Sequence, residues 1–321
     1  MNDRAPRQRV IIDCDPGVDD GVALLLAFAA PDLELLGITT VAGNVEASLT
    51  ARNACLIRDI AARHDVPVFA GCSQPLVRSA VEAGHFHGAS GLGNLPIAVP
   101  QHGPSSEHAV DFLVRTLHQA AEKSISLVIT GPMTNVATAL ARDPSIVRAI
   151  REFAIMGGAR SEGGNITASA EYNIYADPHA AQIVFNAGPT VRAFGLDVTH
   201  QVRATPARTA ALAALGTAAA KTAASLVEFS NSLAANGPRE LGSPLHDPCP
   251  IAWLLAPRLF EFRTCHIDVE TDSPLTQGHT AVEFRPLSDR RQNIEWAVRA
   301  DADGVFALLH RYLSAAQSGN V

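Results

Sequence analysis

Hydrophobic and polar positions alternate along the chain in two different periods. Short runs of β-branched and aliphatic residues, typical of buried strands, occur at residues 10–12, 35–41, 67–70, 126–130, 153–156 and 191–196. Longer stretches with apolar residues at helical spacing occur at residues 18–30, 47–64, 107–121, 134–141 and 179–186. Strands that alternate with helices in this way predict an α/β protein with an open, mainly parallel sheet and helices on both faces. Ligands of such sheets bind beyond the carboxyl ends of the strands.

The last third of the chain departs from this rhythm. Residues 264–270 and 280–284 predict two late strands that add a small antiparallel part, so the sheet is expected to be mixed. Residues 296–316 predict a closing helix. Residues 204–240 begin with an Ala-rich segment that predicts a surface helix, and they form a candidate helical cap over the site. No repeat or linker is evident, so residues 1–321 are expected to form one domain.

The composition narrows the class of protein. Of the 321 residues, 47% are hydrophobic and 18% are charged, which suits a chain with a large buried core. The formal net charge of −7 argues against polymeric nucleic acid or an anionic membrane surface as a partner. The five cysteines are scattered and lack CxxC spacing, which favours reduced thiols in a cytoplasmic protein. No apolar signal segment stands near residue 1, and the longest aliphatic stretch is too short to span a bilayer.

Four carboxylates lie within eight residues directly after the first predicted strand, in the segment DCDPGVDD. They are Asp13, Asp15, Asp19 and Asp20. The Pro-Gly pair between them predicts a tight turn, and negative charge in the first helical turn is favoured by the helix dipole. That effect accounts for one or two of the carboxylates and not for four, because without a cation they would repel one another. Clustered oxygen ligands of this kind suit Ca²⁺ or Mg²⁺.

Two other kinds of acidic site begin with similar patterns. An EF-hand loop is excluded, because the glycine offset differs and an apolar strand precedes the cluster instead of a helix. A Mg²⁺-dependent phosphohydrolase of the haloacid dehalogenase type also begins with a strand followed by DxD, and it would use Asp13 as its nucleophile. This chain has Gly17 where such enzymes normally carry Thr or Val. The phosphohydrolase interpretation is therefore kept only as the alternative.

Two later stretches offer further polar side chains. His246 and Asp247 precede a proline, which favours an extended conformation at Asp247. A Gly-flanked stretch carries Asn165, Glu171 and Asn173. Amides and a carboxylate at such spacing suit a polyhydroxyl ligand such as a sugar. Taken one at a time, these stretches do not define a function.

Together, these stretches resemble the inosine-uridine-preferring nucleoside hydrolase family. The matching motifs are DCDPGVDD (13–20), ITTVAGN (38–44), GHFHG (84–88), LVITGPMTN (127–135), MGG (156–158), AEYNIYADP (170–178), GLDVTH (195–200) and HDPC (246–249). The resemblance covers nearly the whole chain. It implies a Rossmann-like nucleoside hydrolase fold. It also implies hydrolysis of the N-glycosidic bond of purine or pyrimidine ribonucleosides to ribose and free base.

The resemblance further implies one Ca²⁺ per subunit. The implied ligands are Asp15, Asp20, Asp247 and the backbone carbonyl of Thr130. Asp15 would also be the general base for a calcium-bound water, helped by Asn44. The ribose 2′- and 3′-hydroxyls would complete the coordination, so 2′-deoxynucleosides are expected to be poor substrates.

Contacts to the sugar follow from the same motifs. The resemblance implies that Asp19 and Asn173 bind ribose hydroxyls. Asn165 and Glu171 would bind the 5′-hydroxyl, and Met156 would lie near the sugar.

The leaving-group side is less sharply defined. His246 matches the position thought to protonate the departing base, and an ordinary histidine pKa suits that task near neutral pH. His87, in a Gly-rich loop, is a second candidate to line the base pocket, whereas His200 is expected to be structural. The helix before HDPC offers only Phe229 as an aromatic base contact. Tyr172, where the family often has Phe, adds a hydroxyl near the 5′ end of the sugar.

A third class of function is a non-catalytic nucleoside-binding protein that kept the fold. The intact set of acidic and amide positions argues against it. The resemblance also implies a homodimer or homotetramer and a role in nucleoside catabolism or salvage, while the preferred base stays open.

Overall fold

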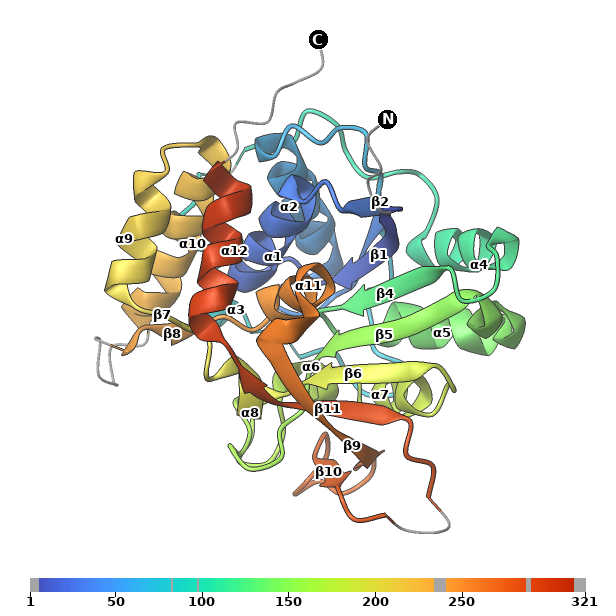
Figure 1. The fold of residues 1–321 in the computed structure, drawn as a ribbon. Coiled ribbons are helices and arrows are strands. Elements are labelled where there is room, and N and C mark those ends of the chain that lie inside the picture. Colours follow the sequence, from blue (N-terminus) through green and yellow to red (C-terminus); the bar gives the residue numbers. More distant parts are fainter. Residues whose placement is uncertain (1–5, 82, 97, 234–240, 287–289, 315–321) are drawn as a thin grey trace.

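The computed structural model describes residues 6–81, 83–96, 98–233, 241–286 and 290–314 (Figure 1). Within them a nine-stranded sheet has the strand order β10-β9-β11-β6-β5-β4-β1-β2-β3. A separate antiparallel pair joins β7 to β8. The strands are β1 (Gln8–Cys14), β2 (Leu33–Thr40), β3 (Val68–Ala70), β4 (Ile125–Ile129), β5 (Ile150–Met156), β6 (Thr190–Phe194), β7 (Arg203–Ala204), β8 (Ser243–Pro244), β9 (Phe260–Val269), β10 (Thr280–Glu283) and β11 (Ile294–Ala300).

The middle of the sheet is parallel. β1 pairs with β2 and β4, β5 pairs with β4 and β6, and β6 pairs with β11, all in parallel. β9 runs antiparallel to both β11 and β10, which makes the sheet mixed. The expected α/β fold with an open, mainly parallel sheet is therefore confirmed. Because the parallel strands end at the same edge, the loops that follow β1, β2, β4 and β5 come together there.

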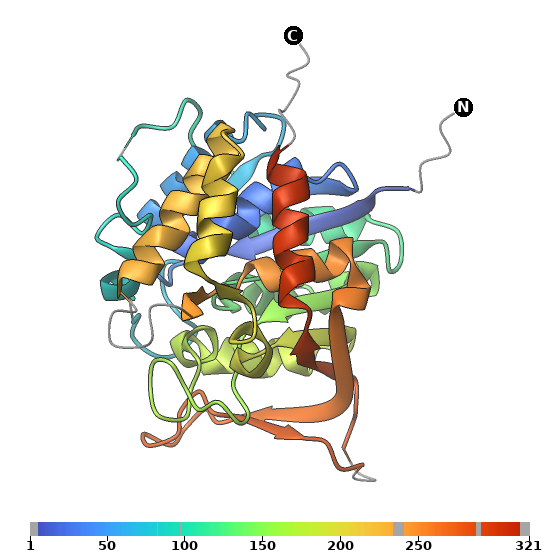
Figure 2. The same ribbon diagram turned by 60° about the vertical axis from the view of Figure 1, so that its left-hand side comes forward.

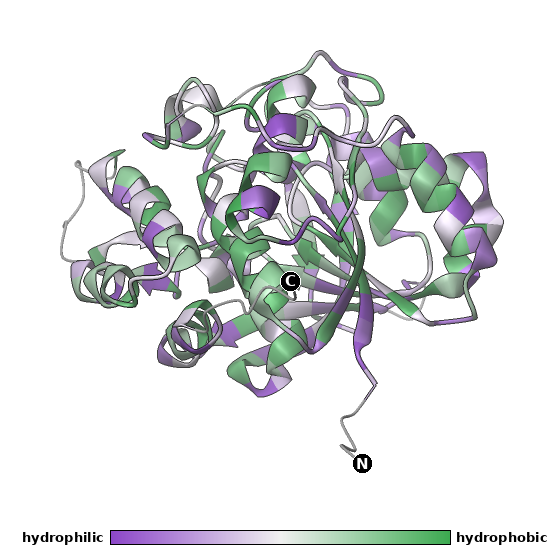
Figure 3. Ribbon diagram, turned by 90° about the horizontal axis from the view of Figure 1, so that it is seen from above, coloured by the Kyte–Doolittle hydropathy of each residue, from purple (hydrophilic) through white to green (hydrophobic). Residues whose placement is uncertain are grey.

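Helices cover both faces of the sheet (Figures 1 and 2). α2, α10, α11 and α12 all pack against α1 on one face, and α4, α5 and α7 pack together on the other. Figure 3 shows hydrophobic residues gathered on the strands and on the inner sides of the helices. The helices are α1 (Val18–Ala29), α2 (Ala47–Ile60), α3 (Gly84–His87), α4 (Ala109–Gln119), α5 (Thr134–Arg142), α6 (Tyr172–Ala176), α7 (Pro178–Phe185), α8 (Leu196–Thr199), α9 (Pro206–Ala214), α10 (Ala218–Leu233), α11 (Pro248–Leu255) and α12 (Ala302–Ser314).

β1 shows why its sequence forms a central strand. Val10 and Ile12 belong to the apolar cluster beneath α1, while Ile11 belongs to the cluster beneath α4 and α5. Both faces of the strand are thus buried, which explains its continuous apolar run. The strand ends where the chain turns polar, and this places the acidic segment at the carboxyl edge of the sheet.

The predicted helix over residues 296–316 was wrong in its first part. Trp296 lies in β11, where it is 1% exposed between β6 and β9. Asp301 then begins α12, because its carboxylate accepts a hydrogen bond from the Gly304 amide at 3.0 Å. The apolar-polar-apolar order of Ile294, Glu295 and Trp296 is the strand signal that the helical prediction did not use.

The Ala-rich start of the candidate cap forms two helices instead of one. α9 and α10 are separated at Gly216, which has a φ of +78°. α10 packs against α1, and residues 234–240 of the candidate cap lie outside the described residues. In the part of the chain that the structure describes, no helix is long and apolar enough to cross a membrane.

Candidate active site

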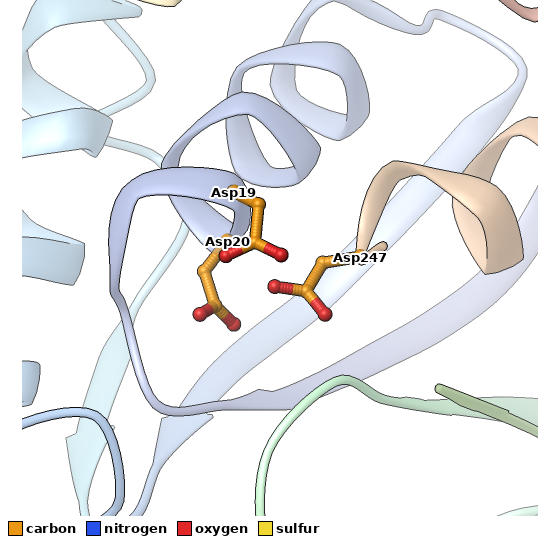
Figure 4. Close-up of side chains that lie close together, drawn as sticks. All are labelled: Asp19, Asp20 and Asp247. Atoms are coloured by element: carbon orange, nitrogen blue, oxygen red, sulfur yellow. The ribbon is translucent and has the colours of Figure 1, made fainter. Parts of the chain in front are cut away.

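The turn between β1 and α1 brings three acidic residues to the carboxyl edge of the sheet. Figure 4 shows Asp19 and Asp20 in the first turn of α1, facing Asp247 at the start of α11. Each of the three offers a carboxylate oxygen within 4.8 Å of the others. Burial and the neighbouring Asp19 raise the pKa of Asp20 to about 7, and burial raises the pKa of Asp247 as well. Carboxylates packed this closely favour a hard divalent cation between them.

Asp15 lies buried beside this cluster. Its Oδ2 accepts a hydrogen bond from the Asn44 amide at 2.7 Å, while Oδ1 has no hydrogen-bond partner among the described residues. A Cβ at Gly43 would lie 2.0 Å from Oδ2, and one at Gly131 would lie 2.7 Å from Oδ1. Both glycines are needed for the loops to close around the carboxylate. Burial and the charge of Asp20 raise the pKa of Asp15 above its ordinary value.

Asn44 and Thr130 connect the loops around this centre. The Asn44 side-chain amide donates to the Asp15 carbonyl at 3.1 Å and to Asp20 Oδ2 at 3.0 Å. The Thr130 hydroxyl donates to Asp20 Oδ1 at 2.9 Å. Asn44 thus binds the Asp15 carboxylate through its backbone amide, while its side chain holds the turn through the Asp15 carbonyl and Asp20. This geometry could not be read from the sequence, where Asn44 was expected only to help Asp15.

Asp13 faces away from the other carboxylates. It is 1% exposed, and its Oδ1 accepts hydrogen bonds from the Thr39 hydroxyl at 2.6 Å and the Asn135 amide at 2.8 Å. Burial raises its pKa to about 7. The Thr39 and Asn135 side chains thus hold Asp13 Oδ1 within the protein, and this disfavours Asp13 as the nucleophile of a phosphohydrolase.

The predicted sugar-binding residues lie together on the other side of the centre. The Asn173 amide donates to the Thr130 carbonyl at 2.8 Å and to the Met156 carbonyl at 3.1 Å. The Thr130 carbonyl keeps a second lone pair for another partner. These contacts hold Asn173 at the cavity wall between the ends of β4 and β5.

Glu171 organises the adjoining loop. Its carboxylate caps α6 by accepting from the Asn173 amide at 2.9 Å, and it also accepts from the Gly158 amide at 2.9 Å. Burial raises the pKa of Glu171 to about 7. Asn165 accepts from the Tyr172 amide at 2.9 Å, and the Tyr172 hydroxyl donates to the Val81 carbonyl at 2.6 Å.

A cavity of about 320 Å³ opens over these groups. Its size falls in the range of small-molecule sites. Predicted residues in its wall are Asp19, Asn44, His87, Thr130, Met156, Asn165, Glu171, Tyr172, Asn173, His246 and Asp247. The wall also contains residues that were not expected from the sequence to contact a ligand, and these are Val18, Ala83, Phe86, Ile166, His200, Ser230, Leu233, Ser243 and Pro244. Asp15 and Asp20 lie buried beneath the wall.

Two neighbouring histidines also line this cavity. His246 Nδ1 is 2.8 Å from the Thr199 hydroxyl, and enclosure by protein lowers its pKa to about 4. The ring of His200 lies 5.7 Å from that of His246, and its Nδ1 is 2.9 Å from the Glu162 carboxylate. His200 was expected to be structural, yet it also lines the cavity. Its place directly after the GLDVT segment was the available signal.

His87 and Phe229 occupy different surroundings. His87 lines the cavity, and its Nδ1 accepts a hydrogen bond from the Val18 amide at 3.1 Å. Phe229 packs instead with the apolar cluster beneath α1 and against Gly93, outside the cavity wall. Among the predicted site residues, Phe229 alone neither lines the cavity nor belongs to the acidic centre. α10 turns Ser230 and Leu233 toward the cavity in its place.

The chain is similar in sequence and in fold to known nucleoside hydrolases. Residues 10–307 match the family described as inosine-uridine preferring nucleoside hydrolase. The chain is 38% identical to the inosine-uridine preferring nucleoside hydrolase of Crithidia fasciculata, over 94% of this chain and 96% of that protein. It is 40% identical to the pyrimidine-specific ribonucleoside hydrolase RihA of Salmonella gallinarum, over 94% and 96% of the two chains. The solved purine-preferring ribonucleoside hydrolase from Gardnerella vaginalis superposes with a TM-score of 0.89 at 33% identity, covering 96% of this chain and 98% of that one.

The α/β fold and the acidic cavity therefore define an N-glycosidase that acts on ribonucleosides. More narrowly, the chain belongs to the inosine-uridine preferring nucleoside hydrolase family.

Proposed function

We propose that this enzyme hydrolyses purine or pyrimidine ribonucleosides to ribose and free base with the help of one calcium ion per subunit. The observation that carries the proposal is the make-up of one cavity. Its wall combines clustered carboxylates and amides suited to a sugar with histidines and apolar side chains. A ribonucleoside has this same division between a polyhydroxyl sugar and a planar base.

The residues present fit a calcium ion. Asp20, Asp247 and the Thr130 carbonyl, with Asp15 beside them, are the proposed ligands, and all are oxygen donors. The unpartnered Asp15 Oδ1 supports this, because a buried carboxylate oxygen needs a compensating charge or donor. Asp19 also lies within the cluster, so its carboxylate can face either the ion or the sugar. When bound, calcium supplies positive charge that holds the ribose diol and eases deprotonation of a nearby water.

Asp15 is the proposed general base. It takes a proton from the water that attacks C1′ on the face opposite the leaving base, as in an inverting glycosidase. Burial raises the pKa of Asp15 in the metal-free protein, and a bound cation would counteract this, so that the carboxylate is ionised and able to accept the proton. The surrounding carboxylates also stabilise the positive charge that develops on the ribose ring.

The sugar is proposed to lie against the polar wall. Asp19 and Asn173 bind ribose hydroxyls, Asn165 and Glu171 bind the 5′-hydroxyl, and Met156 packs beside the ring. The hydrogen bonds that Glu171 accepts from three backbone amides hold its carboxylate in place before substrate arrives. Such preorganisation reduces the loss of entropy on binding.

His246 is the proposed group that protonates the departing base, with His87 as the second candidate. The hydrogen bond to Thr199 fixes the orientation of the His246 ring. A neutral His246 that carries its proton on Nε2 can also donate a hydrogen bond to a base nitrogen. α9 and α10 would form the cap, and we propose a cytoplasmic homodimer or homotetramer that acts in nucleoside catabolism or salvage.

The test is base release from inosine, uridine, cytidine, adenosine and 2′-deoxyuridine, with calcium and with a chelator. We expect release from ribonucleosides that the chelator abolishes and added calcium restores. Equal rates on uridine and 2′-deoxyuridine would contradict the role of the ribose diol. Release of phosphate from a phosphomonoester, without action on nucleosides, would favour the phosphohydrolase alternative.

A further inference from the structure

His200 in the cavity wall is paired with a carboxylate. Its Nδ1 lies 2.9 Å from a carboxylate oxygen of Glu162, and the two side chains are 27% and 46% exposed. A carboxylate at this distance holds a proton on Nδ1 and stabilises the positively charged form of the ring. Nε2 is then the ring atom that is left to meet a ligand in the cavity that His200 lines.

Backbone hydrogen bonds hold the two partners together. The Asp197 carboxylate of α8 accepts from the Arg160 amide and from the Ser161 amide, both at 2.8 Å. These bonds tie the loop that carries Glu162 to the helix that ends directly before His200. The loop and the helix thus place the carboxylate against the ring before any substrate arrives.

His246 lies beside His200 on a neighbouring segment. The Leu245 amide donates to the Val202 carbonyl at 2.8 Å, so the two segments are joined next to the two histidines. The ring centroids are 5.7 Å apart, and both rings line the cavity. Nδ1 of His246 lies against the Thr199 hydroxyl, which is a neutral partner, whereas Nδ1 of His200 lies against a carboxylate. The two rings therefore reach the same part of the cavity, and His200 is the one with a charged partner.

We propose that His200 and Glu162 form a second proton donor to the departing base, which acts beside His246. The proposal rests on the proposed function and deepens its leaving-group side. As the bond between C1′ and the base nitrogen breaks, its electron pair goes to the base. The proton on His200 Nε2 then passes to a nitrogen or carbonyl oxygen of that base. The attacking water forms the new bond to C1′ and gives its proton to Asp15.

The partial exposure of the pair completes the cycle. Solvent returns a proton to His200 after each turnover, and Asp15 releases the proton that it took from the water. Because the His200 side chain is 27% exposed, this return needs no opening of the buried acidic centre. One proton thus enters at the histidine for each proton that leaves from the aspartate.

The nature of the leaving group separates a proton donor from a residue that only supports the cavity wall. A nucleobase that departs as an anion is a poor leaving group and needs a proton. A nitrophenolate ion departs without one, so a proton donor contributes little to its release. A supporting residue affects both kinds of substrate equally, because both place a ribose in the same cavity.

The test compares kcat and KM for inosine, uridine and a nitrophenyl riboside in the wild type, His200→Asn and Glu162→Gln. His200→Asn lowers kcat on the nucleosides by about 10²-fold, the lower end of the usual contribution of a general acid, with little change in KM. Its kcat on the nitrophenyl riboside stays close to that of the wild type. Glu162→Gln shows the same selectivity with a smaller loss, because an amide holds the ring without stabilising its charge.

The matched control is His118→Asn, which removes an exposed histidine that is paired with Asp143 at 3.2 Å and lies outside the cavity wall. It leaves all three substrates unaffected. The proposal is overturned if His200→Asn keeps wild-type kcat on the nucleosides, or loses equally on nucleosides and on the nitrophenyl riboside. Failure of the proposed function has a different signature, because the wild type then releases no base from either nucleoside, and the second proton donor falls with it.

Discussion

The Asp15 carboxylate is enclosed by protein on almost every side. Gly43 and Gly131 approach it closely, the Asn44 amide holds one oxygen, and the second oxygen lacks a partner among the described residues. A buried carboxylate of this kind reduces stability, and folds retain such groups where they perform chemistry. Its position in the segment DCDPGVDD was predictable from sequence. Gly43 and Gly131 stand in the quoted motifs ITTVAGN and LVITGPMTN, but their closeness to Asp15 required the structure, because they lie in loops after other strands.

Asp15→Asn keeps the shape of this side chain and removes its ability to accept a proton. We expect kcat for nucleoside hydrolysis to fall by about 10²- to 10⁴-fold, the usual contribution of a general base. The thermal midpoint of the chelator-treated variant is expected to equal or exceed that of the wild type, because a buried charge has been removed.

Asp272→Asn, at an exposed carboxylate with no ion pair in the part of the chain that the structure describes, serves as the matched control and leaves both kcat and Tm unchanged. A fully active Asp15→Asn enzyme would remove Asp15 from the mechanism.

The local pattern of apolar and polar residues predicted the strands and helices around the site correctly, but it failed for β11 near the C-terminal end of the chain. β1 and β4 followed from β-branched runs, since strands buried on both faces are apolar throughout. β11 was mistaken for the start of a helix, because no proline or glycine separates it from the first residues of α12. The pairing of β11 with β6 and β9 decides its conformation, and that contact is tertiary. Tertiary packing also decides which side of α10 faces the cavity. Phe229 packs beneath α1 and against Gly93, and this leaves Ser230 and Leu233 in the cavity wall.

Asp301 separates β11 from α12, so its removal should weaken the helix. We expect Asp301→Ala to lower the free energy of unfolding by about 1 kcal/mol, because the N-cap bond to the Gly304 amide is lost. Denaturant unfolding measures this change. Asp301→Asn retains a capping oxygen and should unfold close to the wild type, and equal losses in the two variants would argue against the cap.

At the scale of the whole molecule, the net charge of −7 is unevenly distributed. Carboxylates from segments far apart in the chain meet at one edge of the sheet, and these are Asp13, Asp15, Asp19, Asp20, Glu171 and Asp247. The family resemblance, which rests on the sequence motifs, predicted that these carboxylates belong to one site. The individual distances, and the inclusion of Asp19 in the cluster, required the structure.

This concentration of charge gives the metal-free protein an unusual pH dependence. The pKa values of Asp20 and Glu171 are raised to about 7 in the folded state, so between roughly pH 4 and pH 7 the folded protein holds more protons than the unfolded chain. Stability in chelator therefore decreases as the pH rises through this window. Thermal unfolding from pH 5 to pH 8 measures the slope.

Calcium should flatten that slope, because an ion favours the deprotonated carboxylates that burial disfavours. Glu171→Gln removes one of the titrating groups and should also reduce the slope in chelator. A metal-free protein that becomes more stable from pH 5 to pH 7 would contradict both assignments.

The acidic cluster joins two segments that are synthesised far apart in time. Asp19 and Asp20 are synthesised early, whereas Asp247 follows most of the sheet and the α9–α10 pair. No ribosome-bound fragment that ends before α11 can assemble the centre. An ion that needs all three carboxylates is retained only after the start of α11 has reached the first turn of α1, so the capture of the cation would mark the formation of that long-range contact.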